Sequence, residues 1–298
     1  MTATLDAPVT DPLWRGVGVY TAEELSLAEY HADIVPGGSL SSSGARALLD
    51  PGCPAQFNHD RQNPQGPKKE FEIGTAAHSL LLGTGSELVV VDAEKWATNA
   101  VKAEVLAIRA EDKIPLKPSD MDKVKAMVAA VRAHHQAGPL FAPGGIAEQS
   151  LYWADEATGV TCRCRPDMLR EYPDLTLCVD YKTAVKADPT SASKAIAERN
   201  YHQQDAFYVD GVQAVTGRQA RFVLVFQSKT APYLITVREL SQADRAIGRA
   251  KNAKALRIYA ECERTGVWPD WTGPVDQIPY ISLPPYVAQR EAEEFLNV

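Results

Sequence analysis

The spacing of hydrophobic positions predicts a chain that changes repeatedly between helices and short strands. Apolar residues recur with helical spacing in the segments 72–82, 99–110, 119–136, 201–215 and 241–264. Strand-like alternation covers the segments 146–153, 160–168 and 175–183, and short apolar runs predict further strands at 87–92, 220–228 and 233–238. Short turns at 155–159 and 171–174 predict two antiparallel hairpin links within the region 146–183. We therefore expect an α/β fold with a mixed central sheet flanked by helices.

The first seventy residues carry helix caps and loop signals. Thr21 and Glu24 form a T-x-x-E capping box, which predicts a short helix running toward His31. Ser43 is expected to cap the next helix, and the polar segment 58–69 is expected to form an exposed loop.

These patterns divide the chain into three parts. Residues 1–39 are expected to form an arm with a short helix. Residues 40–264 are expected to form the main domain, with a helical insert near 95–140, and helical additions lie at both of its ends. Residues 265–298, rich in proline and tryptophan, are expected to form an irregular tail packed on the domain.

Composition places the chain among globular proteins. Its 298 residues are 45% hydrophobic and 23% charged, which excludes a disordered chain, a collagen-like fibre and a disulfide miniprotein. No stretch reaches the ~18 apolar residues of a membrane span, and residues 1–14 lack the features of a signal peptide. We therefore expect a cytoplasmic protein with no membrane partner. The five cysteines follow no disulfide spacing, which favours buried, reduced thiols over a metal site.

The net charge of −7 first argues against a nucleic-acid partner, because phosphate binding requires lysine and arginine. The charge is uneven, however. Residues 182–264 hold 14 Lys and Arg against 8 Asp and Glu, a balance of +6, while residues 1–30 and 265–298 carry −4 each. The cations of 182–264 form either a solvated helix face or part of a DNA channel.

Two carboxylates and a lysine gather at one end of the hairpin predicted for residues 160–183. Asp167 follows a proline, where strand pairing stops, and Asp180 and Lys182 share one face of the next strand because side chains alternate. Carboxylates suit Mg²⁺ or Mn²⁺, which activates water and neutralises charge on a scissile phosphate, while a lysine orients the water. The pattern fits metal-assisted phosphodiester hydrolysis. It also fits an ordinary solvated strand face.

Further candidates lie outside this hairpin. His78, on the helix 72–82, is either a metal ligand or a satisfied core histidine. Tyr201 and Gln204 begin a helix whose N-terminus suits an anion or is simply capped. Glu148 is either another acidic ligand or a solvated strand residue.

In combination these motifs resemble the RecE-type exonucleases (exodeoxyribonuclease VIII) of phages and prophages, in the PD-(D/E)XK nuclease superfamily. The resemblance runs from about residue 40 to 240. It is carried by the stretches Leu40–Gly44, Pro54–Phe57, Gly74–His78, Arg165–Asp167, Val179–Thr183 and Tyr201–Tyr208.

The resemblance implies a PD-(D/E)XK (restriction-endonuclease-like) core within residues 40–264. It implies a Mg²⁺-dependent enzyme, with Mn²⁺ expected to substitute, that degrades linear double-stranded DNA from its 5′ ends. The product would be a 3′ single-stranded overhang for a RecT-like annealing protein in phage-type recombination. A ring-shaped homo-oligomer in the cytoplasm of a bacterial host is also expected.

The resemblance assigns roles to individual residues. The implied metal ligands are His78, Asp167, Asp180 and the carbonyl of Tyr181, with Glu148 as a further candidate. Lys182 would position or activate the attacking water, with Gln204 and Tyr201 beside the site. By a looser analogy with lambda-type exonucleases, Ser41, Ser43 and Arg46 would hold the 5′-phosphate. A serine run before a helix also serves as an ordinary N-cap.

One stretch departs from the family pattern. Gln227 and Ser228 precede Lys229 where an acidic residue is expected. No iron–sulfur cluster is expected, because only Cys262 lies downstream of Lys182. Two other functions stay open, a RecB- or Cas4-like nuclease acting on single-stranded DNA ends and a non-catalytic DNA-end-binding protein. The presence of both aspartates and the lysine argues against the second.

Overall fold

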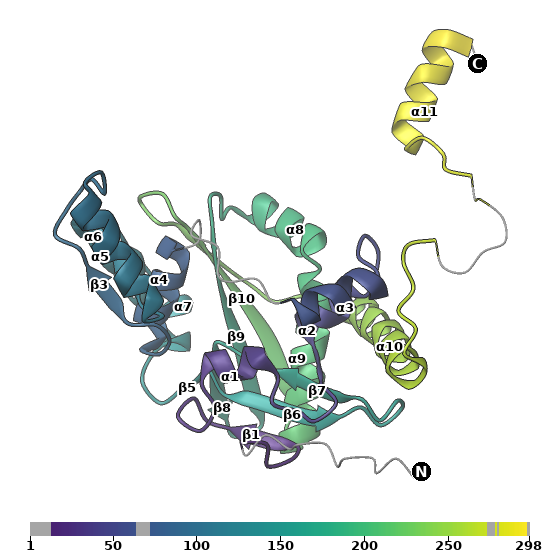
Figure 1. Cartoon of the computed structure of the whole chain (residues 1–298), viewed down its shortest axis with the longest axis horizontal. Helices are drawn as coiled ribbons and strands as arrows, with labels where there is room; N and C mark the ends of the chain where they lie inside the picture. The colour runs from purple at the N-terminus through teal and green to yellow at the C-terminus, as the bar shows by residue number, and fades with distance from the viewer. Residues whose placement is uncertain (1–12, 64–71, 273–277, 279, 297–298) are drawn as a thin grey trace, which may run out of the picture.

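A five-stranded mixed sheet forms the centre of the molecule (Figure 1). The computed structural model describes residues 13–63, 72–272, 278 and 280–296. The strand order is β11-β10-β9-β8-β5, in which β9 and β10 run parallel and the other neighbours are antiparallel. The strands are β5 (Ile146–Ala147), β8 (Met168–Tyr172), β9 (Leu175–Ala184), β10 (Ala220–Ser228) and β11 (Ile235–Arg238). The predicted α/β class with a mixed sheet is confirmed.

A second sheet of four strands, in the order β1-β6-β7-β2, lies beside the first. Its strands are β1 (Gly18–Tyr20), β2 (Leu40–Ser41), β6 (Ser150–Ala154) and β7 (Thr161–Cys164). The prediction of one strand over residues 146–153 is therefore wrong, because β5 and β6 belong to different sheets. Likewise the expected strand 160–168 ends at Cys164, and Met168 begins β8. The two antiparallel hairpin links are confirmed as β6–β7 and β8–β9.

Helices cover both faces of the central sheet. On one face α4 (Glu72–Leu82), α6 (Pro118–Ala133) and α7 (Ala137–Leu140) form a core with Val179 and Tyr181 of β9. On the other face α9 (Tyr201–Thr216) and α10 (Gln242–Thr265) pack over Cys178. This alternation along β9 turns Asp180 toward α9, as the period-two pattern predicts. The strands β3 (Leu88–Val90) and β4 (Ile114–Leu116) pair beside α5 (Asn99–Ala110).

Several local predictions need correction near the N-terminus. Thr21 and Glu24 exchange the predicted hydrogen bonds, yet the helix α1 (Leu27–Ala32) begins later, with Ser26 as its cap. Ser41, and not Ser43, caps α2 (Ser42–Ala47) by accepting a hydrogen bond from the Gly44 amide. The helix α3 (Pro54–Gln62) includes residues 58–62 of the expected loop, and most of the remaining loop lies outside the described residues.

The sequence patterns also missed several elements. The strand β1 lies in the segment expected to be a loose arm, and α8 (Pro189–Glu198) was not predicted. All five cysteines are buried free thiols, as expected.

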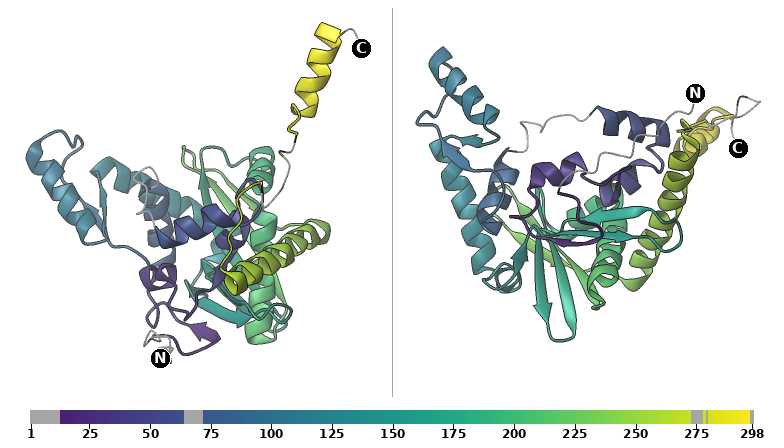
Figure 2. Two further views of the ribbon diagram at one scale, coloured as in Figure 1. Left: turned by 45° about the vertical axis from the view of Figure 1, so that its right-hand side comes forward. Right: turned by 60° about the horizontal axis from the view of Figure 1, so that its bottom comes forward.

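The C-terminal segment differs from the irregular packed tail that was expected. Trp268 does pack against Phe57 and Tyr259, with ring centroids 5.8 and 6.0 Å apart. Beyond it, α11 (Pro285–Glu291) and a short π-helix (Ala292–Leu296) extend away from the body (Figure 2). Among the described helices, none has both the length and the hydropathy to cross a bilayer.

Candidate active site

Glu148 lies where the chain passes from the central sheet to the second sheet. It separates β5 from β6 and adopts a left-handed backbone conformation (φ 51°), which is costly for a residue with a side chain. Its amide donates to the carbonyl of Asp167 at 3.2 Å. Asp167 occupies the corresponding crossing between β7 and β8. The two chain crossings therefore bring two carboxylates to one place.

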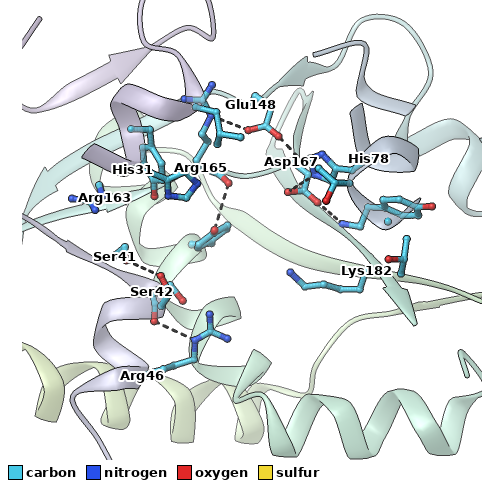
Figure 3. A pocket seen from close by; sticks show the side chains of 18 residues that line it. His31, Ser41, Ser42, Arg46, His78, Glu148, Arg163, Arg165, Asp167 and Lys182 are labelled. Atoms are coloured by element: carbon cyan, nitrogen blue, oxygen red, sulfur yellow. Dashed lines mark hydrogen bonds and ion pairs between the residues drawn. The ribbon is translucent and has the colours of Figure 1, made fainter. Parts of the chain in front are cut away.

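His78 reaches this place from α4. One turn earlier, Gly74 approaches Thr183 of β9 so closely that a Cβ there would lie 2.5 Å from the threonine Oγ1. The absence of a side chain at Gly74 thus lets α4 lie against β9. His78 Nε2 lies 3.2 Å from Asp167 Oδ1 and 3.7 Å from Glu148 Oε1 (Figure 3).

His78, Glu148 and Asp167 form a candidate metal cluster. Each offers a ligand atom, and these atoms all lie within 4.8 Å of one another. Imidazole and carboxylate donors fit Mn²⁺ or Mg²⁺, with histidine the more favourable for manganese. Glu148 is 8% exposed, so the expectation of a solvated strand residue is wrong. The donor set thus fits a divalent cation.

The protonation of these groups reflects their proximity. Burial lowers the pKa of His78, but the carboxylates of Asp167 and Glu148 outweigh it and raise the pKa to about 9. Burial raises the pKa of Glu148, with a contribution from Asp167. Burial raises the pKa of Asp167, but the neighbouring His78 and Lys182 outweigh this and hold the pKa below its usual value.

Arg165 holds Glu148 in place. Its Nε donates to Glu148 Oε2 at 2.8 Å, and its Nη1 donates to the carbonyl of Leu25 at 3.0 Å and to Ser150 Oγ at 3.0 Å. Its side chain is 5% exposed, so this ion pair is buried. Sequence reasoning quoted Arg165 in a motif without giving it a role. An arginine directly after a strand with buried cysteines was the available signal.

Asp180 and Lys182 form a second group beside the cluster. Lys182 Nζ lies 2.6 Å from Asp180 Oδ2, and Gln204 Nε2 donates to Asp180 Oδ1 at 2.7 Å. Asp180 is 2% exposed, and burial, with some help from Asp167, raises its pKa despite Lys182. Burial lowers the pKa of Lys182, but Asp180 outweighs this and the pKa is raised, so the ammonium stays charged. Within the described residues, Asp180 is not part of the three-residue cluster, and its role as a ligand stays a prediction.

Tyr181 connects the two groups through its backbone. Its amide donates to Asp167 Oδ2 at 2.6 Å. The N–H and C=O of one strand residue point to the same edge, so the Tyr181 carbonyl faces the Asp167 side, as its predicted role requires. The Tyr181 hydroxyl donates to Gln227, at the position where an acidic residue was expected. Gln227 therefore supports the tyrosine and is fully buried.

The predicted 5′-phosphate residues lie on another wall of the same cavity (Figure 3). Ser41 Oγ and Ser43 Oγ are 3.0 Å apart, and Arg46 Nη1 donates to the carbonyl of Arg199 at 2.8 Å. Arg163, missed by sequence reasoning, also lines this wall. Tyr201 lies outside it, with its ring centroid 5.0 Å from Lys182 Nζ.

One cavity of about 520 Å³, named here the active-site cavity, joins these groups. Its walls include the cluster residues, Lys182, the serines and Arg46. This combination of acidic ligands, a charged lysine and nearby anion-binding groups fits a hydrolytic site for phosphate esters.

Asp167 directly precedes β8, and Asp180 and Lys182 lie on β9. This arrangement on a mixed sheet defines a PD-(D/E)XK nuclease fold. A model of the PDDEXK-like domain of unknown function (DUF3799) matches residues 41–279, and the chain belongs to this family. The match supports a nuclease of this superfamily, as the motifs predicted, while the RecE-type assignment stays a prediction.

A solved structure agrees with this fold. A crystal structure of a candidate exonuclease from Eubacterium rectale aligns with a TM-score of 0.57 at 11% identity, covering 94% of this chain and 99% of that one. At this identity the likeness concerns the fold alone. A protein named SSO0001 aligns with a TM-score of 0.29 at 12% identity, covering 64% of this chain and 85% of that one, which is too low to carry an argument. No curated protein matches the chain significantly.

Proposed function

We propose that this protein is a metal-dependent exodeoxyribonuclease that resects linear double-stranded DNA from its 5′ ends and leaves 3′ single-stranded overhangs. The observation that carries the proposal is the joint position of the His78–Glu148–Asp167 cluster and Lys182 on the wall of one cavity. The family match supports the nuclease class, and the order of the motifs supports the exonuclease type.

The cluster residues would hold the cation, with Asp180 and the Tyr181 carbonyl as further ligands. When bound, Mg²⁺ or Mn²⁺ supplies Lewis-acid activation of water and neutralises charge on the scissile phosphate. Arg165 fixes the orientation of Glu148, and the Tyr181 amide fixes that of Asp167. The chain therefore holds its ligands in place through groups outside the cluster.

Lys182 is the candidate for orienting the attacking water. Its ion pair with Asp180 keeps the ammonium charged, so that it can donate hydrogen bonds to water or to a phosphate oxygen. Gln204 holds Asp180 from the other side and so fixes the pair. Tyr201 restricts the lysine through the face of its ring.

The wall with Ser41, Ser43 and Arg46 supports recognition of a 5′-phosphate. Hydroxyl and guanidinium donors are suited to phosphate oxygens, and they line the cavity that also contains the metal cluster. The proposal extends to a RecT-like annealing partner, a ring-shaped homo-oligomer, and action in the cytoplasm of a host cell. The motif resemblance supports these extensions.

Digestion of end-labelled linear duplex with Mg²⁺ or Mn²⁺ tests the proposal. We expect nucleotides to be released from 5′ ends, faster from 5′-phosphate than from 5′-hydroxyl ends, with no action on closed circles. Release from 3′ ends, or a preference for single strands, would replace the proposed polarity by a RecB- or Cas4-like activity. Tight binding of ends without cleavage in either metal would indicate a non-catalytic end-binding protein.

A further inference from the structure

A second cavity of about 490 Å³ adjoins the active-site cavity and is named here the basic cavity. It lies at the carboxyl ends of the parallel strands β9 and β10, where α8 and the start of α9 cross between them. This is the location at which α/β sheets commonly bind ligands. Lys182 and Thr183 line both cavities, so the two cavities adjoin at the proposed catalytic lysine.

Cations dominate the lining of the basic cavity. Lys186, Lys194, Arg199 and Lys229 line it together with Lys182, against a single acid, Glu198. Within the described part of the chain, the side chains of Lys186, Lys194 and Arg199 form no ion pair, and all three are exposed. The cavity therefore presents positive charge that the chain itself does not neutralise.

Other arginines of the same basic segment are used differently. Four of them pair with carboxylates of the chain, in the pairs Arg221–Glu239, Arg245–Asp205, Arg249–Asp210 and Arg264–Glu261. These pairs neutralise four of the 14 cations of residues 182–264, whereas Lys186, Lys194 and Arg199 form no ion pair among the described residues. Three such cations around one cavity favour a polyanion at this place.

We propose that the basic cavity binds the phosphodiester backbone of the DNA strand whose reacting phosphate lies in the active-site cavity. The inference rests on the proposed function. A strand that passes Lys182 on leaving the metal cluster comes next to the basic cavity, because that lysine lines both spaces. Successive phosphates then meet Lys194 of α8 and Arg199 at the C-terminus of that helix.

The apolar part of the lining suits bases more than a free phosphate ion. Tyr201 is partly exposed and lines the basic cavity, and Val185 at its edge is 77% exposed. Grooves that bind a single strand combine cations along the backbone with aromatic or apolar surfaces for the bases. The basic cavity has both, so a single nucleic-acid strand is its expected occupant.

Binding of fluorescent oligothymidylates of 3 and 10 nucleotides, with Ca²⁺ in place of Mg²⁺, tests this proposal. The test variant is K194A/R199A, and the matched control is K254A/R257A, which removes the same two charge types from exposed positions on α10 outside both cavities. We expect the test variant to bind the 10-mer about tenfold or more weakly at low salt. The slope of log K against log salt concentration should become shallower by about 1.4. This is the loss of two phosphate contacts at roughly 0.7 each for a single strand.

The 3-mer and the control variant decide the outcome. The proposal requires that the control bind the 10-mer like the wild type and that the advantage of the 10-mer over the 3-mer shrink in K194A/R199A. Equal losses in both double variants would overturn it, since general electrostatic attraction would then explain the binding. A wild type that binds in this way but cleaves no DNA would refute the nuclease proposal and leave the strand-binding site intact.

Discussion

His78 Nε2 lies 3.2 Å from Asp167 Oδ1, so an imidazole proton and a divalent cation compete for the same atoms. The Asp167→Asn variant keeps the shape and removes the charge. We expect it to weaken Mn²⁺ binding by more than the ~10–100-fold seen for residues that only support ligands. Isothermal titration with Mn²⁺ measures this, and D210N, at a partly exposed aspartate outside the active-site cavity, is the control. Unchanged affinity in D167N would remove Asp167 from the ligand set.

The pH dependence of stability follows from the same contact. In the chain without metal, the pKa of His78 is raised from 6.5 to about 9, so its charged form stabilises the fold. This contribution is fully present below pH 6.5 and is lost as the pH rises through 9. The difference in unfolding free energy between wild type and H78N, measured in urea with EDTA, should therefore shrink over that range by up to about 3 kcal/mol. A difference that stays constant from pH 6 to 9.5 would contradict the charged pair.

Lys182 offers a test of the chemistry. Replacement by alanine removes the ammonium that Asp180 holds at 2.6 Å, and we expect DNA cleavage to fall by about 10²–10⁴-fold, the usual contribution of a positioned proton donor or acceptor. Cleavage of end-labelled duplex at saturating metal gives the rate. K254A, with the same substitution on an exposed face, should cleave normally. If K182A retained full activity, the assignment of Lys182 would fail.

Arg165 is predicted to matter for stability as well as for activity. The Arg165→Met variant leaves Glu148 buried without its cation, which costs about 3–5 kcal/mol when one partner of a buried pair is removed. Urea denaturation measures the loss. The double variant R165M/E148Q should regain part of the stability but none of the activity, because it lacks the carboxylate of Glu148. Equal stability of R165M and wild type would show that the pair is solvated.

Gly74 gives an unusual expectation for a helix. Replacing a glycine inside a helix by alanine normally stabilises by about 0.5–1 kcal/mol. At Gly74 the new Cβ would lie 2.5 Å from Thr183 Oγ1, so α4 must move away from β9 and carry His78 with it. We expect G74A to be less stable and to bind Mn²⁺ more weakly, by thermal unfolding and titration. The additional change T183A should restore part of both losses, and a more stable G74A would refute the close approach.

The sequence predicted the parts of the fold that depend on local periodicity. The strand β9 and the helices α4 and α9 were placed within a residue or two, because each keeps one period and ends at a clear signal such as Gly83. The same alternation placed the side chains of Asp180 and Lys182 on one face of β9. Local patterning therefore sufficed for the lysine half of the site.

The cluster half could not be predicted in the same way. The alternation of residues 146–153 continues across Glu148, so the pattern does not reveal that the chain changes sheets there. The burial of Glu148 depends on Arg165, which is distant along the sequence, and on the left-handed backbone. The strand β1 depends similarly on pairing with β6. Such contacts arise from tertiary structure and leave little trace in a local window.

The position of the cluster at the two chain crossings has a mechanical consequence. Glu148 and Asp167 each lie where the chain passes between a strand of the central sheet and a strand of the second sheet. His78 belongs to α4, which packs on one face of the central sheet. A cation held by all three would cross-link the two sheets and the helix layer at a single point. Binding of the cation would then make the whole domain more rigid, so that the metal-bound, active form would also be the more rigid one.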